Sequence, residues 1–150
     1  MKIKFIIPIL FLLFVGCTDK DDNLVQSSNL EINNSTISGK WYIKGSTING
    51  GAFQNYAHDC STKRDYQDFH QNGELDFVGY NSSCAISGVE TSLWSLSSGN
   101  VLNVNSLPGA AIPYAYVYVI QSLTSEELVL KQTYNDPSGQ VIEVSYYTRN

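Results

Sequence analysis

Cysteine, histidine and carboxylate side chains are the groups of this sequence that could carry chemistry. The chain has three cysteines and two histidines, His58 and His70. Hydrolytic catalysis needs a nucleophile, a base and an orienting group held together. Neither Gly-x-Ser-x-Gly nor His-Glu-x-x-His occurs, and no pair of carboxylates lies in an apolar setting. We therefore expect a protein that is not an enzyme and has no cofactor.

Acidic side chains gather on one predicted hairpin. Asp68 and Asp76 would face each other there, with His70 and Glu74 beside them. Like charges opposed across a sheet destabilise it, and a calcium ion held by the carboxylate oxygens would relieve that cost. Such clusters are more often a solvated surface, so we expect no metal site.

Aromatic side chains recur at alternate positions in the second half of the chain. Alternate residues of a strand share one face, so each run would direct its rings to one side. Rings with hydroxyl tips suit a small amphipathic ligand, although filling the interior of a small barrel is their more common role. The candidate ligand-binding residues are Trp94, Tyr114, Tyr116, Tyr118, Gln132, Tyr134 and Tyr146.

The acidic cluster lies on a predicted hairpin whose turn contains Asn72-Gly73. Asn-Gly supplies the positive φ that a tight hairpin turn needs. Pairing across this turn places Phe69 and Leu75 together on an apolar face, and the same register places Cys60 opposite Cys84. We therefore predict a disulfide between Cys60 and Cys84, which implies an oxidising compartment.

Three further strand pairs follow along the chain. The first joins residues 91–97 to 101–105 through a three-residue loop. In the second we oppose Ile120 to Leu130, because the alternative register would bury a glutamine. The last pair turns at residues 135–139, which would set Leu128 against Tyr146 on the inner face.

The fold class follows from the number and order of these strands. A strand at Trp41 and Ile43 opens the series, and a long loop over Gly45–Asp59 precedes the first hairpin. Eight sequential antiparallel strands with one apolar face close most simply into an up-and-down barrel, which leaves no open edge. A two-sheet sandwich of the same strands is the alternative.

The N-terminal segment has the pattern of a secretory signal. Lys2 and Lys4 precede an apolar run from Phe5 to Val15, which is too short to span a membrane. The sequence Phe14-Val15-Gly16-Cys17 resembles the lipobox of bacterial lipoproteins, which implies that Cys17 is acylated and anchors the chain. This leaves the other two cysteines as a pair.

The expected organisation is therefore a lipoprotein signal peptide at 1–16, a lipidated cysteine with a flexible tether at 17–38, and a barrel domain at 39–150. Residues Thr18–Asp22 resemble the acidic export signal of Bacteroidetes lipoproteins, and a solvated charged tether is the alternative. We expect an outer-membrane lipoprotein of a bacterial cell envelope, and the acidic stretch favours exposure at the cell surface.

Short motifs in a fixed order connect the barrel region to a known family. Gly39-Lys40-Trp41 matches the Gly-x-Trp signature that begins the lipocalin barrel. A Phe-x-x-x-Gly turn at 69–73 and a final Tyr-Tyr-x-Arg follow it. The chain thus resembles the lipocalin-like domain of Bacteroidetes lipoproteins, although it lacks the long C-terminal helix of animal lipocalins. The resemblance implies a fold and a location; it leaves the ligand undefined.

The leading function that we expect is binding or carrying a small amphipathic or hydrophobic molecule inside the barrel. The alternative is a protein-interaction or inhibitor module that uses the rim loops Gly45–Asp59 and Ser106–Pro113. The net charge is −5, and no basic patch could neutralise phosphates, so we expect no nucleic-acid partner.

Overall fold

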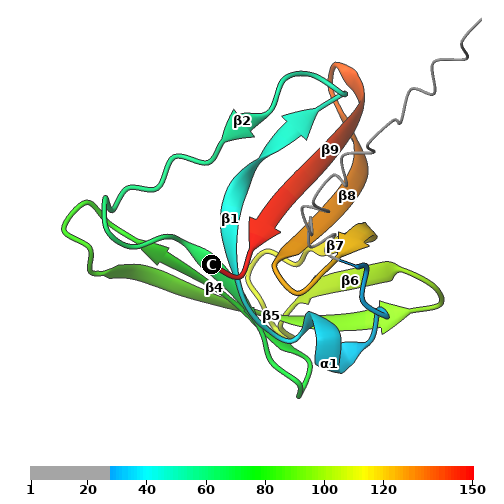
Figure 1. Ribbon diagram of the computed structural model, residues 1–150, viewed down its shortest axis with the longest axis horizontal. Helices are drawn as coiled ribbons and strands as arrows, with labels where there is room; N and C mark the ends of the chain where they lie inside the picture. The colour runs from blue at the N-terminus through cyan, green and yellow to red at the C-terminus, as the bar shows by residue number, and fades with distance from the viewer. Residues whose placement is uncertain (1–27) are drawn as a thin grey trace, which may run out of the picture.

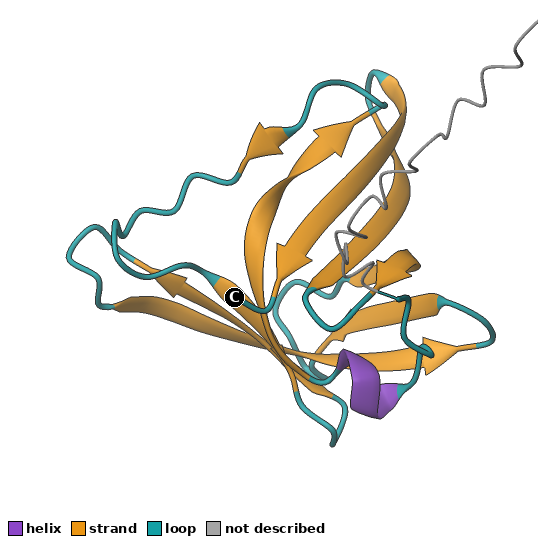
Figure 2. Ribbon diagram, in the orientation of Figure 1, coloured by secondary structure: helices purple, strands orange, loops and turns teal. Residues whose placement is uncertain are grey.

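The computed structural model describes residues 28–150, which form an antiparallel β-barrel with one short helix (Figures 1 and 2). The elements are α1 (Asn34–Ile37), β1 (Gly39–Ile48), β2 (Gln54–Asn55), β3 (Tyr66–Phe69), β4 (Glu74–Tyr80), β5 (Ile86–Ser97), β6 (Val101–Ser106), β7 (Ala115–Leu123), β8 (Glu127–Asp136) and β9 (Gly139–Thr148). Within these residues no helix is long and apolar enough to cross a membrane.

Closure of the sheet comes from β1, which pairs with β3 along its first half and with β9 over most of its length. The eight long strands therefore form a closed antiparallel barrel, as the sequence predicts, and the sandwich is not formed. Because every long strand has two neighbours, no full-length edge is left unpaired. In Figure 1, β1 and β9 lie side by side although they begin and end the barrel sequence.

Three of the predicted pairings are confirmed. Phe69 opposes Leu75 on β3 and β4, Trp94 opposes Val104 on β5 and β6, and Ile120 opposes Leu130 on β7 and β8. The disulfide between Cys60 and Cys84 is also present, with the two Cα atoms 4.9 Å apart.

The register predicted for the last pair is wrong by one residue. Leu128 opposes Tyr147 instead of Tyr146, because the turn has two residues, Pro137 and Ser138, instead of the expected five. The side chain of Asp136 tightens this turn by accepting the backbone N–H groups of Ser138 (2.7 Å) and Gly139 (3.1 Å). A shift of one residue moves each side chain to the opposite face of a strand.

The predicted long loop after β1 is also shorter than expected. The strand continues to Ile48, and the chain returns as β2, with Asn55 opposite Gly45. Gly45 has a φ of 151°, and a Cβ atom there would overlap the carbonyl oxygen of Gln54. Glycine therefore permits the close approach of the two backbones, and β2 extends the wall where β3 has ended.

One end of the barrel is closed by residues that were expected to belong to the flexible tether. Ile37 of α1 is fully buried, and Leu30 and Ile32 pack against the same core. The backbone N–H of Leu30 donates to the carbonyl of Leu123 (2.7 Å). The folded domain therefore begins before residue 39, because these apolar side chains cover the open core at this end. The rest of the predicted tether lies outside the described residues, as do the predicted signal peptide and Cys17.

Arg149 connects the segment that covers this end, residues 28–38, to the barrel. Its guanidinium lies 4.1 Å from the centroid of Trp41 and donates to the carbonyl oxygens of Thr36 (2.7 Å) and Ser38 (3.2 Å). The indole N–H of Trp41 donates to the carbonyl of Ile37 (2.7 Å). Burial lowers the pKa of the Arg149 guanidinium. We call this the closed end; the opposite end, with the loops 49–65, 81–85 and 107–113, is the open end.

Candidate ligand-binding site

The interior of the barrel, which we call the lumen, contains two cavities. The first, the tyrosine cavity, has a volume of about 290 Å³. The second, the β9 cavity, has a volume of about 350 Å³. Cavities of this size approach or fall within the range of small-molecule sites in proteins, about 300–1,000 Å³.

Strands from the whole circumference contribute to the two cavities. The tyrosine cavity is lined by Gln67, Leu75, Phe77, Glu90, Ser92, Leu102, Val104, Tyr114, Tyr116, Tyr118 and Leu130. The β9 cavity is lined by Ile43, Gly45, Ser46, Gln54, Asn55, Tyr56, Ala57, Glu143, Ser145 and Tyr147.

Three tyrosines form a row on the wall of the tyrosine cavity, Tyr114 directly before β7 and Tyr116 and Tyr118 on it. The rings of Tyr114 and Tyr116 are stacked, with centroids 5.0 Å apart, and those of Tyr116 and Tyr118 are 6.3 Å apart. The alternation of the strand produces this row, because residues two apart face the same side. Burial, with a smaller contribution from neighbouring Tyr116 and Glu143, raises the pKa of Tyr118 to about 12. Its hydroxyl therefore keeps its proton at neutral pH and can donate a hydrogen bond.

A carboxylate stands at one end of this tyrosine row. The Tyr114 hydroxyl donates to Oε1 of Glu90 at 3.0 Å. Burial is the largest cause of the raised pKa of Tyr114, and the hydrogen bond to Glu90 is the next. Ser92, the next inward residue on β5, is buried and donates to the Leu75 carbonyl (3.3 Å). The cavity thus combines apolar walls with a small number of placed polar groups.

The β9 cavity has a similar mixture. Glu143 and Ser145 line it from β9, together with Tyr147, whose ring is buried in the core. Burial is the main cause of a raised pKa at the Tyr147 hydroxyl. On β8, the residue opposite Glu143 is Gln132, which in turn opposes Tyr118 on β7. This chain of pairings connects Glu143 with the other end of the tyrosine row.

Three of the seven predicted ligand-binding residues line a cavity of the lumen. Tyr114, Tyr116 and Tyr118 line the tyrosine cavity as predicted. Trp94 is a core residue near the closed end: it is 4% exposed and its indole N–H donates to the His70 carbonyl (2.9 Å).

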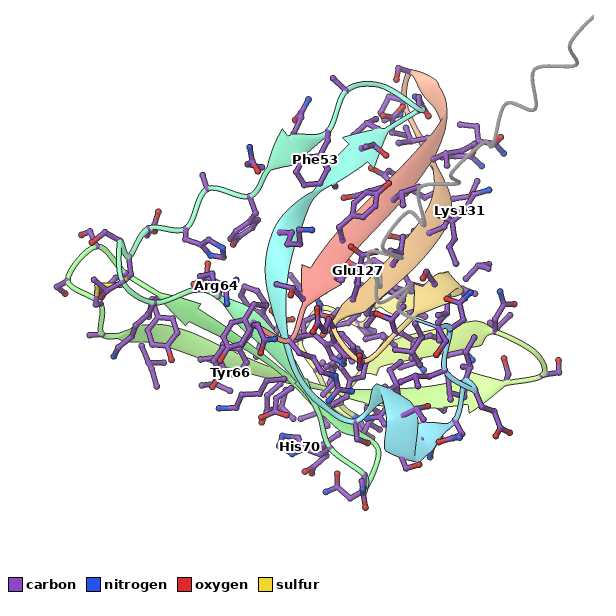
Figure 3. The ribbon with its side chains drawn as sticks, in the orientation of Figure 1. Phe53, Arg64, Tyr66, His70, Glu127 and Lys131 are labelled. Atoms are coloured by element: carbon purple, nitrogen blue, oxygen red, sulfur yellow. A yellow bond between two sulfur atoms is a disulfide. The ribbon has the colours of Figure 1, made fainter. Side chains whose placement is uncertain are left out.

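The remaining three predicted residues do not line either cavity. Gln132 and Tyr134 follow the inward alternation of β8, without being part of a cavity wall. Tyr146 was predicted to face inward, and this is wrong because of the register shift. Its ring lies on the outer face against Phe53, which is labelled in Figure 3, with centroids 5.4 Å apart. Tyr147 takes the inward position.

Two inward carboxylates were missed by sequence reasoning. Glu90 lies on β5, which begins at Ile86 instead of the expected residue 91. Counting back by twos from Trp94 through Ser92 would have placed Glu90 on the inner face. Glu143 was missed because the wrong register assigned the odd-numbered residues of β9 to the outer face.

A buried carboxylate anchors the loop at the open end. Asp65 is 5% exposed and accepts the Tyr56 hydroxyl (3.0 Å) and the Tyr80 backbone N–H (2.8 Å). Burial, followed by this hydrogen bond, raises the pKa of Tyr56 to about 12. The Asp65 backbone N–H donates to Nδ1 of His58, whose Nε2 is 3.0 Å from the Ile43 carbonyl. These contacts give His58 a structural role in holding the loop.

The acidic hairpin is arranged as the sequence predicts, with Asp68 opposite Asp76. His70 Nε2 lies 2.9 Å from Asp76, and the Thr91 hydroxyl donates to the same carboxylate at 2.6 Å. The Thr91 bond, then that of His70, lowers the pKa of Asp76. Across residues 28–150 no three histidine, cysteine or acidic side chains converge as a metal site would require.

The described residues therefore form a closed, antiparallel up-and-down β-barrel with a cavity lined by tyrosines. The family profile described as the lipocalin-like domain matches residues 37–130, which is more than half of the chain. The chain therefore belongs to the lipocalin-like domain family.

Several solved structures are similar to this chain. Lobster apocrustacyanin A1 has a TM-score of 0.49 at 13% identity, over 79% of this chain and 63% of that one, so the chain spans less than two thirds of its length. Odorant Binding Protein OBP1 has a TM-score of 0.48 at 13% identity, over 81% and 77% of the two chains. Bovine odorant binding protein, in complex with a selenium-containing odorant, has 0.46 at 15% identity, over 83% and 77%. Comparison with the curated proteins gives no match.

Proposed function

We propose that this barrel binds a small amphipathic molecule in its lumen. The observation that carries the proposal is the tyrosine cavity, which joins apolar walls to placed polar groups. Leu75, Leu102 and Leu130 offer an apolar surface for the body of a ligand, and removal of that surface from water is favourable by about 25 cal/mol per Å². The tyrosine hydroxyls and Glu90 would fix its polar end. Membership of the lipocalin-like family is consistent with a binding role.

The proposed activity is binding or carriage without a chemical step. The histidines are engaged in structural contacts, His58 with the Ile43 carbonyl and Asp65, and His70 with Asp76. Neither histidine lines the tyrosine cavity or the β9 cavity. A general base must reach the atom from which it takes a proton, and in these two cavities no histidine is placed to do so.

A blocking substitution tests the proposal. Val104 faces the tyrosine cavity, and its neighbour on β6, Asn105, is exposed on the other face. Val104→Trp would fill the cavity, whereas Asn105→Trp adds the same side chain outside it. The probe is N-phenyl-1-naphthylamine, whose fluorescence rises on transfer to an apolar site. We expect saturable binding to the wild type and to Asn105→Trp, and at least tenfold weaker binding to Val104→Trp.

The thermal unfolding of both variants serves as the control, because overpacking a core costs roughly 1–3 kcal/mol. Saturable binding that survives in a folded Val104→Trp protein would contradict a site in the lumen. Absence of binding to the wild type by this probe and by a series of alkyl amphiphiles would contradict the proposed function.

A second candidate function is protein interaction through the rim loops, which exposed apolar side chains favour. Ile112 is 81% exposed and Leu107 is 39% exposed, both on the loop between β6 and β7. Phe53, on the loop before β2, is 43% exposed. Exposed apolar surface of this kind is a feature of interaction sites. A partner retained by the wild type and lost by Ile112→Ser with Leu107→Ser, with lumen binding unchanged, would support this candidate.

We further propose that the barrel is anchored in a bacterial envelope through Cys17, at the outer membrane and with its domain at the cell surface. The lipobox-like sequence before Cys17 and the acidic residues after it support this proposal. Metabolic labelling with a radioactive palmitate should label the wild type and leave Cys17→Ala unlabelled. Protease treatment of intact cells would then test surface exposure, and equal labelling of both proteins would contradict the anchor.

A further inference from the structure

The charges that face the lumen are all of one sign in the described part of the chain. Glu90 lines the tyrosine cavity and Glu143 lines the β9 cavity. Neither wall contains a lysine, an arginine or a histidine. A lumen of this kind therefore has a negative potential, which low-dielectric walls strengthen relative to open water.

The basic side chains of residues 28–150 are placed elsewhere. Lys131 lies on β8 one residue from the inward Leu130 and Gln132, and alternation turns it to the outer face (Figure 3). Lys44 pairs with Glu127 (3.7 Å). Arg149 is held at the closed end over Trp41. Three more, Lys40, Lys63 and Arg64, lie over tyrosine rings of an outer groove, lined by Lys40, Tyr42, Thr62, Lys63, Arg64, Tyr66 and Tyr80.

Both lumen carboxylates consequently lack a cationic partner within the described residues. The ion pairs found there join Lys44 to Glu127, His58 to Asp65 and His70 to Asp76. Glu90 does accept one neutral hydrogen bond, from the Tyr114 hydroxyl at 3.0 Å. A carboxylate has room for several donors, so this bond leaves most of its accepting capacity free.

The tyrosine row connects the positions of the two carboxylates. Tyr114 contacts Glu90 at one end, and the charge of Glu143 contributes to the raised pKa of Tyr118 at the other. The faces of aromatic rings attract cations, and they do so more strongly when the cation is desolvated. Rings and carboxylates together therefore form a surface that favours a positive head group, with the leucines of the same cavity available to an apolar tail.

We propose that the lumen selects a cationic amphiphile, an amine or quaternary ammonium group carrying an apolar chain, over neutral and anionic amphiphiles. This inference rests on the proposed function, because it assumes that the lumen is a binding site. Glu90 is exposed and lines the tyrosine cavity, and it also lines a pocket beside the loop 107–113 of the open end. It receives the head group near this end. Glu143 adds to the attraction from the opposite wall.

Three amphiphiles with the same ten-carbon chain test this charge selection: decyltrimethylammonium, 1-decanol and decyl sulfate. Each is titrated into the full chain by calorimetry below its micelle-forming concentration. We expect the cation to bind about tenfold more tightly than the alcohol, and the sulfate to bind more weakly than both. The preference for the cation should fall as salt is added, because part of it is screened.

Isosteric variants locate the selection. Glu90→Gln and Glu143→Gln should each weaken binding of the cation by about threefold to fivefold more than they weaken binding of 1-decanol, because the amide can still hydrogen-bond a hydroxyl but carries no charge. Glu126→Gln, which removes the same charge from an exposed loop at the closed end, should change neither. Because all variants are identical elsewhere, any binding by other parts of the chain cancels in the comparison. Circular dichroism establishes that each variant is folded.

The outcomes separate the two proposals. If the three amphiphiles bind within about twofold of one another and the Val104→Trp variant binds none of them, the lumen is a site and the charge selection is refuted. If none of the three binds to the wild type, the proposed function and this inference both fail. A cation preference that persists in the Glu90→Gln, Glu143→Gln double variant would refute the assignment to these carboxylates.

Discussion

Removal of the disulfide should cost the barrel a large part of its stability. Cys60 and Cys84 are 24 positions apart in the sequence and join the long loop before β3 to the turn between β4 and β5. In the chain-entropy account, a link closing a loop of about 25 residues raises the free energy of the unfolded chain by roughly 3.5 kcal/mol at 25 °C. The whole free energy of unfolding of a domain is typically about 5–15 kcal/mol.

The double variant Cys60→Ala, Cys84→Ala gives the clearest measurement. Urea unfolding followed by tryptophan fluorescence should show a midpoint lower by about 2 M, since the urea dependence of small domains is about 1–3 kcal/mol per M. The wild type in the presence of a reducing agent should shift by a similar amount. The control is the oxidised wild type with reductant omitted, and the fitted slopes reveal any change in the denatured state.

Hydrogen bonds near the disulfide also hold this end of the hairpin together. The Lys63 ammonium donates to the Cys84 carbonyl (2.9 Å), and the Tyr80 N–H donates to Asp65 nearby (2.8 Å). If these hydrogen bonds alone held the hairpin, the midpoint would fall by less than about 0.5 M, and the entropic reasoning would be refuted. A loss near the expected value with native-like spectra would support it.

Three further predictions test other parts of the structure. Tyr147→Ala should destabilise the domain by about 3–5 kcal/mol in urea unfolding, because its ring is buried, and Tyr146→Ala by about 1 kcal/mol or less; the reverse order would contradict the register of β9. Arg149→Met, which keeps an apolar stem, should cost about 2–4 kcal/mol, because two carbonyl partners are left without a donor, and Arg149→Lys should recover less than half of this loss. The pKa of Asp76 is lower in the folded protein than its unfolded value of 3.8, so ionised Asp76 stabilises the folded state. This stabilisation is fully present above pH 3.8 and is lost as the pH falls through the lower folded-state pKa. In Asp76→Asn, the free energy of unfolding should therefore fall less steeply as the pH is lowered below about 4. An unchanged acid dependence would show that Asp76 does not cause it.

Much of the fold could be predicted because turn chemistry is local. Asn72-Gly73 specifies a tight turn and hence the register of β3 and β4, and the three-residue loop after Ser97 does the same for β5 and β6. The final hairpin shows the limit of this reasoning. The five polar and turn-forming residues 135–139 could form either of two loops, and the side chain of Asp136 selects the shorter.

The candidate site was predictable in part for the same reason. Alternation along one strand identifies Tyr114, Tyr116 and Tyr118 as a set, whichever way the barrel closes. The inward positions of Glu90 and Glu143 depend on the exact start of β5 and the register of β9, which turn patterns did not determine. Alternation from Trp94 places Glu90 on the inner face once the start of β5 is known, whereas the same counting fails for Glu143 because the register of β9 was wrong by one residue.

Local sequence patterns were enough to predict the all-β class, the disulfide and three hairpin registers, since each depends on residues near one another along the chain. Only the folded barrel shows how β1 meets β9, how residues 28–38 close one end, and which charges face the lumen. These features could not be predicted because closure brings together segments more than a hundred residues apart, such as Thr36 and Arg149. Burial of apolar surface drives that meeting, and it is non-directional, so no single short pattern records its outcome.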